Sequence, residues 1–394
     1  MPQFAPFPGI RYAVDDLAVV TAPPYDVIDP DERAALAAQH PHNVVRIDMP
    51  VVEDGPDPYA VAAQTLNSWR ADGVLRSDAP AFYPYRMTFT DETGATRSTL
   101  GVLGALGISP AARADVLPHE HTTPKAHSDR LSLLRATQAN LSAIWGLSLT
   151  TGLTGRIALE TAEPIDSWTD PDGIRHEIWR LDDPAAVRAL SEAIAASPVV
   201  VADGHHRLST CLIHADTDGS PAGADATLCL MVELDHDQLT VQPIHRLIAG
   251  LPGDADPAQA LGKSFDVGEL EPFPDAGVVA RLVAERALAL ITPDGLRLLR
   301  PRHPSGPGVV EPLDSETVAA AVAELPEHEL TYQHGVSRAV AAVRAGRAQA
   351  AILLRPVSVE QIRATAAARG LMPPKSTFFH PKPRTGTVFR SLLD

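Results

Sequence analysis

A change of hydrophobic spacing near the middle of the chain constrains the fold more than any other feature. Residues 199–201 are three consecutive valines, and a short apolar run of this kind is typical of a buried strand. Asp203 and Gly204 break the run, and from Leu208 onward the apolar residues follow a helical spacing. The sequence therefore predicts a strand, a tight glycine turn and a helix, with the motif DGHHR at the turn and on the first turn of the helix.

This motif has the chemistry of an anion site. Backbone N–H groups and the positive end of the helix dipole converge at a helix N-terminus, where they favour phosphate. Arg207 would add a forked donor suited to phosphate or carboxylate. The alternative is an N-cap Asp203 followed by His205 and His206 on the surface. Because these residues cost helix propensity and offer no packing, we favour a functional site made by Asp203, Gly204, His205, His206 and Arg207.

Composition limits the classes of function. The chain has 394 residues, 45% of them apolar, which suffices for two domains or one elaborate domain. Its 33 basic and 49 acidic residues give a net charge of −16, which argues against nucleic acid or an anionic membrane as a partner. The N-terminus has no signal-peptide pattern, and no apolar run approaches the ~20 residues of a membrane span, so we expect a cytoplasmic protein. Cys211 and Cys229 lie in apolar runs and are expected to be buried thiols.

The N-terminal region contains a second candidate segment. Residues 18–28 are expected to form a strand that runs into a double proline, which presents Tyr25 and Asp26 beyond it. An aspartate cap and a proline then predict a helix over 30–39, and residues 43–50 are expected to form a strand. A strand end that opens onto a helix is where sites of α/β proteins collect, although a plain turn is the alternative.

The most polar segment of the chain offers acid, base and cation together. Glu120 could act as a general base with His119 or His121 beside it, and Lys125 could neutralise phosphate. A helix that begins at 127 or 128 and closes at an asparagine then carries Arg130. A metal site is an alternative, but HEH is not the HExxH spacing, and side chains two residues apart converge only on a strand or an irregular loop. A solvated loop is the other alternative.

The remaining elements indicate an α/β or α+β fold. Between about 163 and 247 the expected order is strand, strand, helix, strand, helix, strand, strand, which predicts a mixed sheet. Asn140, His245 and Arg246 lie at element ends and are candidate substrate or supporting residues. We expect a core over 1–250, an accessory α/β region over 251–345 and a C-terminal segment over 346–394 that completes the site.

The C-terminal segment combines aromatic residues with cations. Its three phenylalanines require burial, so the segment is expected to be pinned down with its cations aimed at the site rather than spread along the surface. The cations are Lys375, His380, Lys382, Arg384 and Arg390, and the phenylalanines are Phe378, Phe379 and Phe389. Ser376 lies next to the first of these cations.

Five segments resemble, in the right order, the sequence blocks of a bacterial and archaeal family called domain of unknown function 1015. They are PPYDVI, HEHTTPKAHSDRL with the following ANLSAIW, ADGHHRLSTCL, PIHRL and PPKSTFFHPK, and together they span nearly the whole chain. More distantly, the strand–DGHHR–helix unit resembles the phosphate-binding motif of the ParB/sulfiredoxin-like fold. Free-serine kinases of that fold carry a DGHHR-type motif, whereas sulfiredoxins carry a catalytic cysteine that Gly204-His205-His206-Arg207 lacks. The negative charge and the lack of an evident basic helix-turn-helix argue against the DNA binding of partition proteins.

This resemblance implies a ParB/sulfiredoxin-like mixed-sheet core and nucleotide-dependent phosphoryl transfer to a small hydroxyl substrate, possibly free L-serine. ATP or ADP, with Mg²⁺, would be the cofactor, and the oligomeric state stays open. Under this hypothesis the candidate catalytic residues are His119, Glu120, Lys125, Asp203 and His206. The candidate phosphate or nucleotide ligands are Arg130, Gly204, His205, Arg207, Lys375, Ser376 and Lys382. The alternatives are a metal-dependent phosphoesterase that uses His119, His121, His205 and His206, and a non-catalytic nucleotide sensor. The leading hypothesis places His206 or Arg207 close to Glu120 and Lys375.

Overall fold

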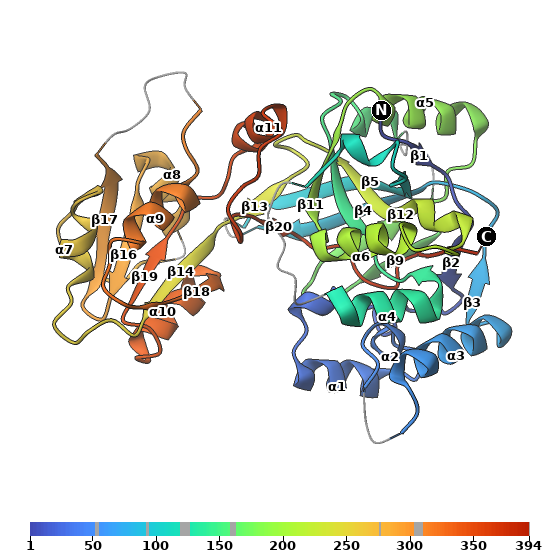
Figure 1. Ribbon diagram of the computed structural model, residues 1–394, viewed down its shortest axis with the longest axis horizontal. Helices are drawn as coiled ribbons and strands as arrows, with labels where there is room; N and C mark the ends of the chain where they lie inside the picture. Colours follow the sequence, from blue (N-terminus) through green and yellow to red (C-terminus); the bar gives the residue numbers. More distant parts are fainter. Residues whose placement is uncertain are drawn as a thin grey trace.

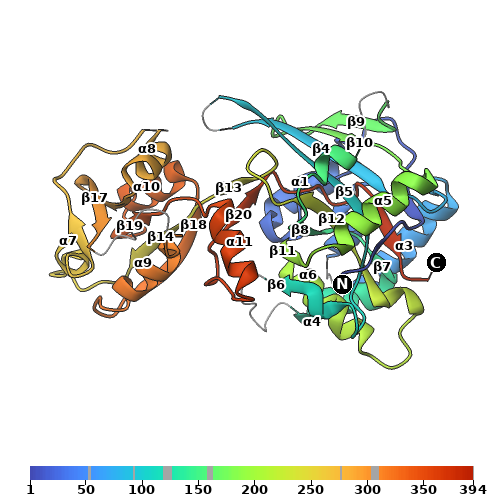
Figure 2. The ribbon, with the colours of Figure 1, turned by 90° about the horizontal axis from the view of Figure 1, so that it is seen from above.

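The chain forms two lobes joined by a narrow ribbon (Figure 1). Both termini lie in the core lobe, and the distal lobe carries a sheet of its own. The linking ribbon is an antiparallel pair of strands, β13 (Thr240–Gln242) and β20 (Phe378–His380), and the two views agree that α11 (Val359–Ala367) lies between the lobes (Figures 1 and 2). The computed structural model describes residues 1–51, 55–91, 94–118, 127–157, 163–275, 277–302 and 310–393.

The core lobe is built on a mixed sheet. Its strands are β1 (Phe4–Ala5), β4 (Tyr83–Thr90), β5 (Thr96–Gly107), β6 (Val116–Pro118), β8 (Ile144–Ser148), β9 (Asp166–Thr169), β10 (Arg175–Ile178), β11 (Val199–Asp203) and β12 (Ala226–Glu233). They run in the order β6-β11-β8-β12-β5-β4-β10-β9, with β1 paired to β5. The pairs β6–β11 and β8–β12 are parallel, whereas β5 pairs antiparallel with β4 and β12. The expected α/β class with a mixed sheet is confirmed.

The core sheet is buried on both faces, which explains the valine run. Val199 and Val201 belong to one apolar cluster, and Val200 points to the other face and belongs to a second cluster. β12 alternates in the same way, with Leu230 on one face and Met231 on the other. Because successive side chains of a strand point to opposite faces, a strand covered on both sides needs apolar residues at every position.

Helices accompany the core sheet, and two of them begin at strong local signals. They are α1 (Pro30–Gln39), α2 (Val45–Asp48), α3 (Pro58–Ala71), α4 (His127–Thr137), α5 (Pro184–Ala195) and α6 (His205–Ala215), and α4 packs against α3 and α6. Asp29 caps α1 by accepting a hydrogen bond from the backbone N–H of Glu32, and Asp183 caps α5 in the same way. Each cap precedes a proline at the first helical position, where its missing N–H costs nothing.

Two expected strands of the N-terminal region are wrong. Residues 17–20 form turns and Tyr25–Val27 a 3-10 helix, and pairing in this stretch is limited to a single antiparallel bridge between Ala22 and Thr385 before the double proline. Residues 43–50 contain the helix α2 instead of a strand. Here the side chain of Asn43 accepts a hydrogen bond from the backbone N–H of Val45, a local bond that favours a turn and a helix start.

The distal lobe contains an antiparallel sheet between two further apolar clusters. Its strands are β14 (Ile244–Ala249), β15 (Phe265–Val267), β16 (Leu288–Thr292), β17 (Gly295–Pro301), β18 (Glu329–His334) and β19 (Ala350–Leu353), in the order β15-β17-β16-β19-β14-β18. The helices α7 (Pro257–Leu261), α8 (Val278–Glu285), α9 (Asp314–Val322) and α10 (Val336–Arg344) accompany it. The edge strand β18 was not expected from the sequence.

The C-terminal segment returns to the core lobe after the distal sheet. Beyond β20 it forms β21 (Phe389–Ser391), which pairs with β2 (Gly9–Tyr12) and β7 (Ala139–Asn140), and β2 also pairs with β3 (Leu75–Ser77). Phe379 and Phe389 are buried, as their apolar character requires. Cys211 and Cys229 are free, buried thiols, which confirms the expectation for both. In the part of the chain that the structure describes, the helices are too short or too polar to span a lipid bilayer.

Candidate functional site

The turn between β11 and α6 depends on a glycine. Gly204 has a φ of 88°, a left-handed conformation that side chains other than that of glycine rarely adopt. A Cβ atom at this position would also lie 3.0–3.1 Å from the guanidinium of Arg207. The glycine therefore lets the strand turn directly into the helix, whose first turn presents backbone N–H groups beyond its own hydrogen-bond ladder.

A cavity of about 180 Å³ lies at this end of α6, and we call it the outer cavity. Segments far apart in the sequence line it together. They are Tyr25, Asp26 and Val27, then Ala202, Asp203, Gly204, His205, His206 and Arg207, then Ile244, and finally Lys375, Thr377, Phe378 and Lys382. The structure thus brings three of the sequence-predicted segments to one place, and Lys375 lines the same cavity as His206 and Arg207.

Ion pairs join these segments across the outer cavity. Asp203 contacts the Arg207 guanidinium at 2.6 Å and the Lys382 ammonium at 2.8 Å, and Lys382 also contacts Asp26 at 2.8 Å. Burial alone would raise the pKa of Asp203, but the positive charges of Lys382 and Arg207 lower that pKa to about 2. Burial likewise opposes the charge of Lys382, yet Asp203 and Asp26 raise its pKa above the ordinary value. Both groups are therefore charged at neutral pH.

Arg207 faces the protein as well as the outer cavity. Its Nη2 donates to Asp203, and its Nη1 donates to the carbonyl oxygen of Ala143. The predicted forked donor is therefore already engaged by the protein. A ligand in the outer cavity would meet Arg207 as part of the wall and as a positive charge.

A second cluster of charged residues lies beside Tyr25. The Arg130 guanidinium lies 4.4 Å from the Tyr25 ring centroid, and its Nη1 contacts Asp48 Oδ1 at 3.2 Å. Its Nε contacts Asp129 at 2.7 Å, and Asp129 accepts a hydrogen bond from Tyr59. Burial raises the pKa of Asp48, and the charge of Arg130 opposes that rise. Arg130 thus lies behind Tyr25 and does not line the outer cavity.

Lys375 and Ser376 have different places. Lys375 lines the outer cavity in a left-handed conformation with a φ of 59°. Ser376 is buried, and its hydroxyl donates to the carbonyl oxygen of Pro373 at 2.7 Å and contacts the Ser315 hydroxyl at 2.8 Å. Its contacts are those of a residue that shapes the loop.

His245 and Arg246 approach the site from β14 in the distal lobe. Burial lowers the pKa of His245 to about 3, and its Nδ1 accepts a hydrogen bond from the backbone N–H of Leu354. Arg246 donates to the carbonyl oxygen of Lys375 at 3.1 Å, while its guanidinium lies 4.7 Å from the Tyr332 ring centroid. Neither residue lines the outer cavity, but Arg246 connects the distal lobe to the backbone of Lys375.

The remaining predicted residues divide into two groups. Asn140 is buried, and its Oδ1 accepts hydrogen bonds from the backbone N–H of Leu228 and from Arg390. His119, Glu120, His121 and Lys125 lie outside the described residues. The described chain before them ends at Pro118, in β6. Pro118 pairs with Val201 of β11 in a parallel register, so the carboxyl end of β6 lies beside the turn that follows β11.

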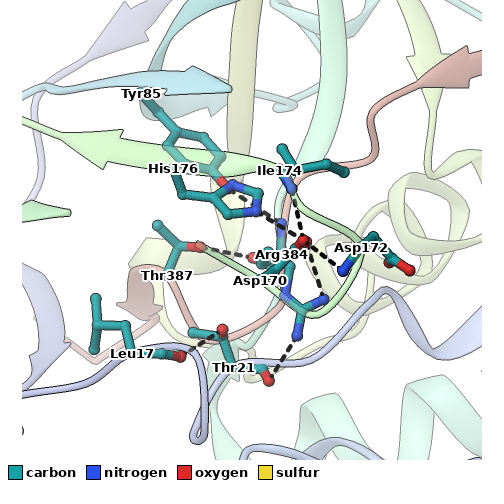
Figure 3. A network of polar contacts seen from close by, with 9 residues as sticks. All are labelled: Leu17, Thr21, Tyr85, Asp170, Asp172, Ile174, His176, Arg384 and Thr387. Atoms are coloured by element: carbon teal, nitrogen blue, oxygen red, sulfur yellow. Dashed lines mark hydrogen bonds and ion pairs between the residues drawn. The ribbon is translucent and has the colours of Figure 1, made fainter. Parts of the chain in front are cut away.

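A buried polar network anchors the segment that carries Lys382 (Figure 3). Arg384 contacts Asp170 at 3.4 Å, Asp170 contacts His176 at 3.1 Å, and His176 contacts the Tyr85 hydroxyl at 2.7 Å. Burial lowers the pKa of His176, although Asp170 opposes this effect. The side chains of Arg384, Asp170 and His176 are at most 4% exposed. The network fixes the C-terminal chain two residues beyond Lys382.

Sequence reasoning missed Asp48, the buried carboxylate beside Arg130. The available signal was an aspartate directly between Ile47 and Met49, which is unusual because charged residues are seldom buried unless paired. Among the residues that the structure describes, no group of three or more His, Cys, Asp or Glu is arranged to hold a metal ion.

The structure defines a mixed α/β protein with a charged cavity at a strand–glycine–helix turn. The chain belongs to the family described as protein of unknown function DUF1015, whose model matches residues 4–326. A search of curated proteins finds no match.

Several solved structures are similar at low identity. A conserved hypothetical protein from Pyrococcus furiosus has a TM-score of 0.39 and 14% identity, over 74% of this chain and 95% of that chain. A mutant free serine kinase in complex with AMP has a TM-score of 0.41 and 14% identity, over 74% and 92%. SbnI from Staphylococcus aureus, with a C-terminal truncation, has a TM-score of 0.39 and 11% identity, over 72% and 85%.

Proposed function

We propose that the protein is a nucleotide-dependent phosphotransferase that moves a phosphoryl group from ATP or ADP to a small hydroxyl substrate. Free L-serine is the first candidate substrate, because the DGHHR motif resembles that of free-serine kinases.

The convergence of three segments on the outer cavity carries the proposal. The cavity lies at the N-terminus of α6, where backbone N–H groups and the helix dipole favour phosphate. Its described lining residues include three basic side chains (Arg207, Lys375 and Lys382) and two carboxylates (Asp26 and Asp203). This excess of positive charge supports an anionic ligand, although the whole chain is strongly acidic.

The residues would divide the chemistry as follows. The first turn of α6, Lys375 and Lys382 would hold the phosphate chain and stabilise the charge that builds on the transferring group. Glu120 would accept the hydroxyl proton as the substrate oxygen attacks phosphorus. Asp26 pairs with Lys382, is 42% exposed at the cavity, and would be the carboxylate that meets Mg²⁺, an ion that binds carboxylates together with substrate phosphates and would neutralise their charge.

The test is an assay for phosphoryl transfer. The purified protein is incubated with Mg²⁺, ATP or ADP, and a panel of hydroxy amino acids, and phosphoserine is measured by ³¹P NMR. Lys382→Met and Glu120→Gln should each lower kcat by about 10²-fold or more. Lys263→Met is the matched control, since Lys263 is 68% exposed in the distal lobe, and it should retain activity.

Absence of turnover with either nucleotide across the whole panel would overturn the proposal. Nucleotide binding without turnover would indicate that the protein is a non-catalytic nucleotide sensor. Metal-dependent release of phosphate from phosphate esters, with no transfer to an acceptor, would assign it to the phosphoesterases.

A further inference from the structure

The outer cavity is too small for a whole nucleotide. Since a water molecule needs about 10–15 Å³ of such volume, a cavity of about 180 Å³ holds about 12–18 groups of that size. ADP has about 27 non-hydrogen atoms, of which the base contributes about 10 and the ribose diphosphate about 17. The ribose and the phosphates therefore fit the cavity, and the base must rest on a surface outside it.

One face of the distal sheet borders the outer cavity. Figures 1 and 2 agree that β18 is the edge of this sheet on the side of the core lobe. The His334 ring, at the carboxyl end of β18, stacks on the Phe378 ring with the centroids 4.1 Å apart, and Phe378 lines the cavity. Ile244 of β14, which pairs with His334, lines the cavity as well. The end of the sheet that carries Ile244 and His334 is therefore part of the cavity's surroundings.

An exposed tyrosine lies on the same face of β18. Because side chains two residues apart point to the same side of a strand, Tyr332 shares a face with His334. Two residues correspond to about 7 Å along a strand, a length that a ribose can span. Tyr332 is 46% exposed, more than any other phenylalanine, tyrosine or tryptophan that the structure describes. The strand therefore presents an aromatic ring one step beyond the cavity.

The Tyr332 ring is held in place by Arg246, its partner on β14. The Arg246 guanidinium lies 4.7 Å from the ring centroid, and Arg246 is only 4% exposed. The same guanidinium donates to the carbonyl oxygen of Lys375, which lines the outer cavity. A single guanidinium therefore connects the ring to the cavity wall. Because this contact orients the ring in advance, the ring would lose little conformational freedom when a base stacks on it.

From this arrangement we infer that Tyr332 is the platform on which the base of the nucleotide stacks. The phosphates lie at the N-terminus of α6 in the core lobe, the ribose occupies the outer cavity, and the base lies on the distal lobe, so that one nucleotide spans both lobes. The inference rests on the proposed nucleotide binding. Stacking uses the π-face that every base has and does not distinguish hydrogen-bonding edges, so the ligand class is a purine nucleotide with either adenine or guanine.

The test separates the base from the phosphates. Calorimetry in the presence of Mg²⁺ compares ADP with inorganic pyrophosphate, which has no base. Tyr332→Ala should weaken ADP binding by about tenfold, the value of one lost base–aromatic stack, and should leave pyrophosphate binding unchanged. Tyr332→Phe keeps the ring and should bind ADP within about twofold of the wild-type chain, and GDP should bind the wild-type chain within about fivefold of ADP. Leu270→Ala is the matched control, since Leu270 is also 46% exposed in the distal lobe, and it should change neither affinity.

A second measurement uses the wild-type chain and is independent of how well Tyr332→Ala folds. The chain is irradiated with 2-azido-ADP, whose reactive group is on the base, and the labelled peptide is identified by mass spectrometry. The label should lie within β18, and an excess of ADP should prevent the labelling.

Three outcomes would overturn the inference while leaving the proposed function intact. They are an ADP affinity that Tyr332→Ala does not change, an equal weakening of ADP and pyrophosphate by this variant, and a preference for ADP over GDP of more than about fiftyfold. Photolabel confined to Tyr25–Val27 would have the same meaning, because Val27, 43% exposed at the cavity, would then hold the base on the core lobe. A wild-type chain that binds neither ADP nor pyrophosphate would overturn the proposed function together with the inference.

Discussion

Replacement of Asp203 by asparagine removes a charge that touches both Arg207 and Lys382. The Asp203 carboxylate is 16% exposed and the Lys382 side chain 11% exposed, so water screens these pairs poorly. Asp203→Asn leaves Lys382 with Asp26 alone and leaves Arg207 with the Ala143 carbonyl oxygen. Breaking a buried ion pair by removing one partner costs about 3–5 kcal/mol, and we expect the lower end because Lys382 keeps Asp26.

The pKa of Asp203 gives an independent magnitude. A fall of this pKa from 3.8 to about 2 corresponds to about 2 kcal/mol of stability. Because the folded protein favours the charged form, this contribution is present above pH ~4 and is lost as the pH falls through the folded pKa. Both routes predict that Asp203→Asn lowers the free energy of unfolding at pH 7 by about 2–3 kcal/mol.

The assay is urea unfolding at pH 7, followed by tryptophan fluorescence. All four tryptophans are buried in the core lobe, so the signal reports the lobe that contains Asp203. Asp266→Asn is the matched control. Its carboxylate is 64% exposed and pairs with Arg302, so the cost should be at most about 1 kcal/mol. If Asp203→Asn costs no more than Asp266→Asn, the account of the ion network is wrong.

Further predictions concern the turn, the anchor and the thiols. Gly204→Ala should weaken ADP binding by about tenfold in calorimetry because the new Cβ displaces Arg207, whereas Gly152→Ala has open space and should not. Equal effects of the two glycine variants would contradict this. Arg384→Met should cost about 3–5 kcal/mol in urea unfolding, since it leaves a buried carboxylate without its cation. Cys211 and Cys229 should react slowly with a thiol reagent in the ligand-free native protein and rapidly in urea, because burial raises the pKa of both thiols. Rapid native labelling of both would refute their burial.

Elements whose start or end is marked by a motif of a few residues could be predicted from the sequence. Asp29 and Asp183, each followed by proline, mark the starts of α1 and α5. The valine run and Gly204 likewise mark the strand, turn and helix around the outer cavity. Caps and left-handed glycines act through local hydrogen bonds and backbone sterics, so they can be recognised in the sequence without knowledge of tertiary contacts.

Elements whose stability comes from distant contacts could not be predicted in this way. Residues 43–50 are apolar enough for a strand, and apolar spacing cannot distinguish a short buried strand from a short buried helix. The edge strand β18 is polar, and its backbone pairing with β14 makes it a strand. In neither segment does the spacing of apolar residues determine which secondary structure forms.

The candidate site was predictable in its composition and less so in its geometry. Asp26, Asp203 and Lys382 could be chosen by residue type, and they do line one cavity. The inward bond from Arg207 to a backbone carbonyl, and the pairing of Arg130 with an aspartate 82 residues away, depend on how α4 and α6 pack. Such pairings follow from tertiary structure, and no periodic pattern in the sequence indicates them.

The most direct test of the central claim is a crystal structure of the protein with ADP and Mg²⁺. The account predicts that the phosphates occupy the outer cavity, within hydrogen-bond distance of the backbone N–H groups of His205 and His206 and of the Lys382 ammonium. Phosphates bound elsewhere, with the outer cavity filled only by water, would contradict it.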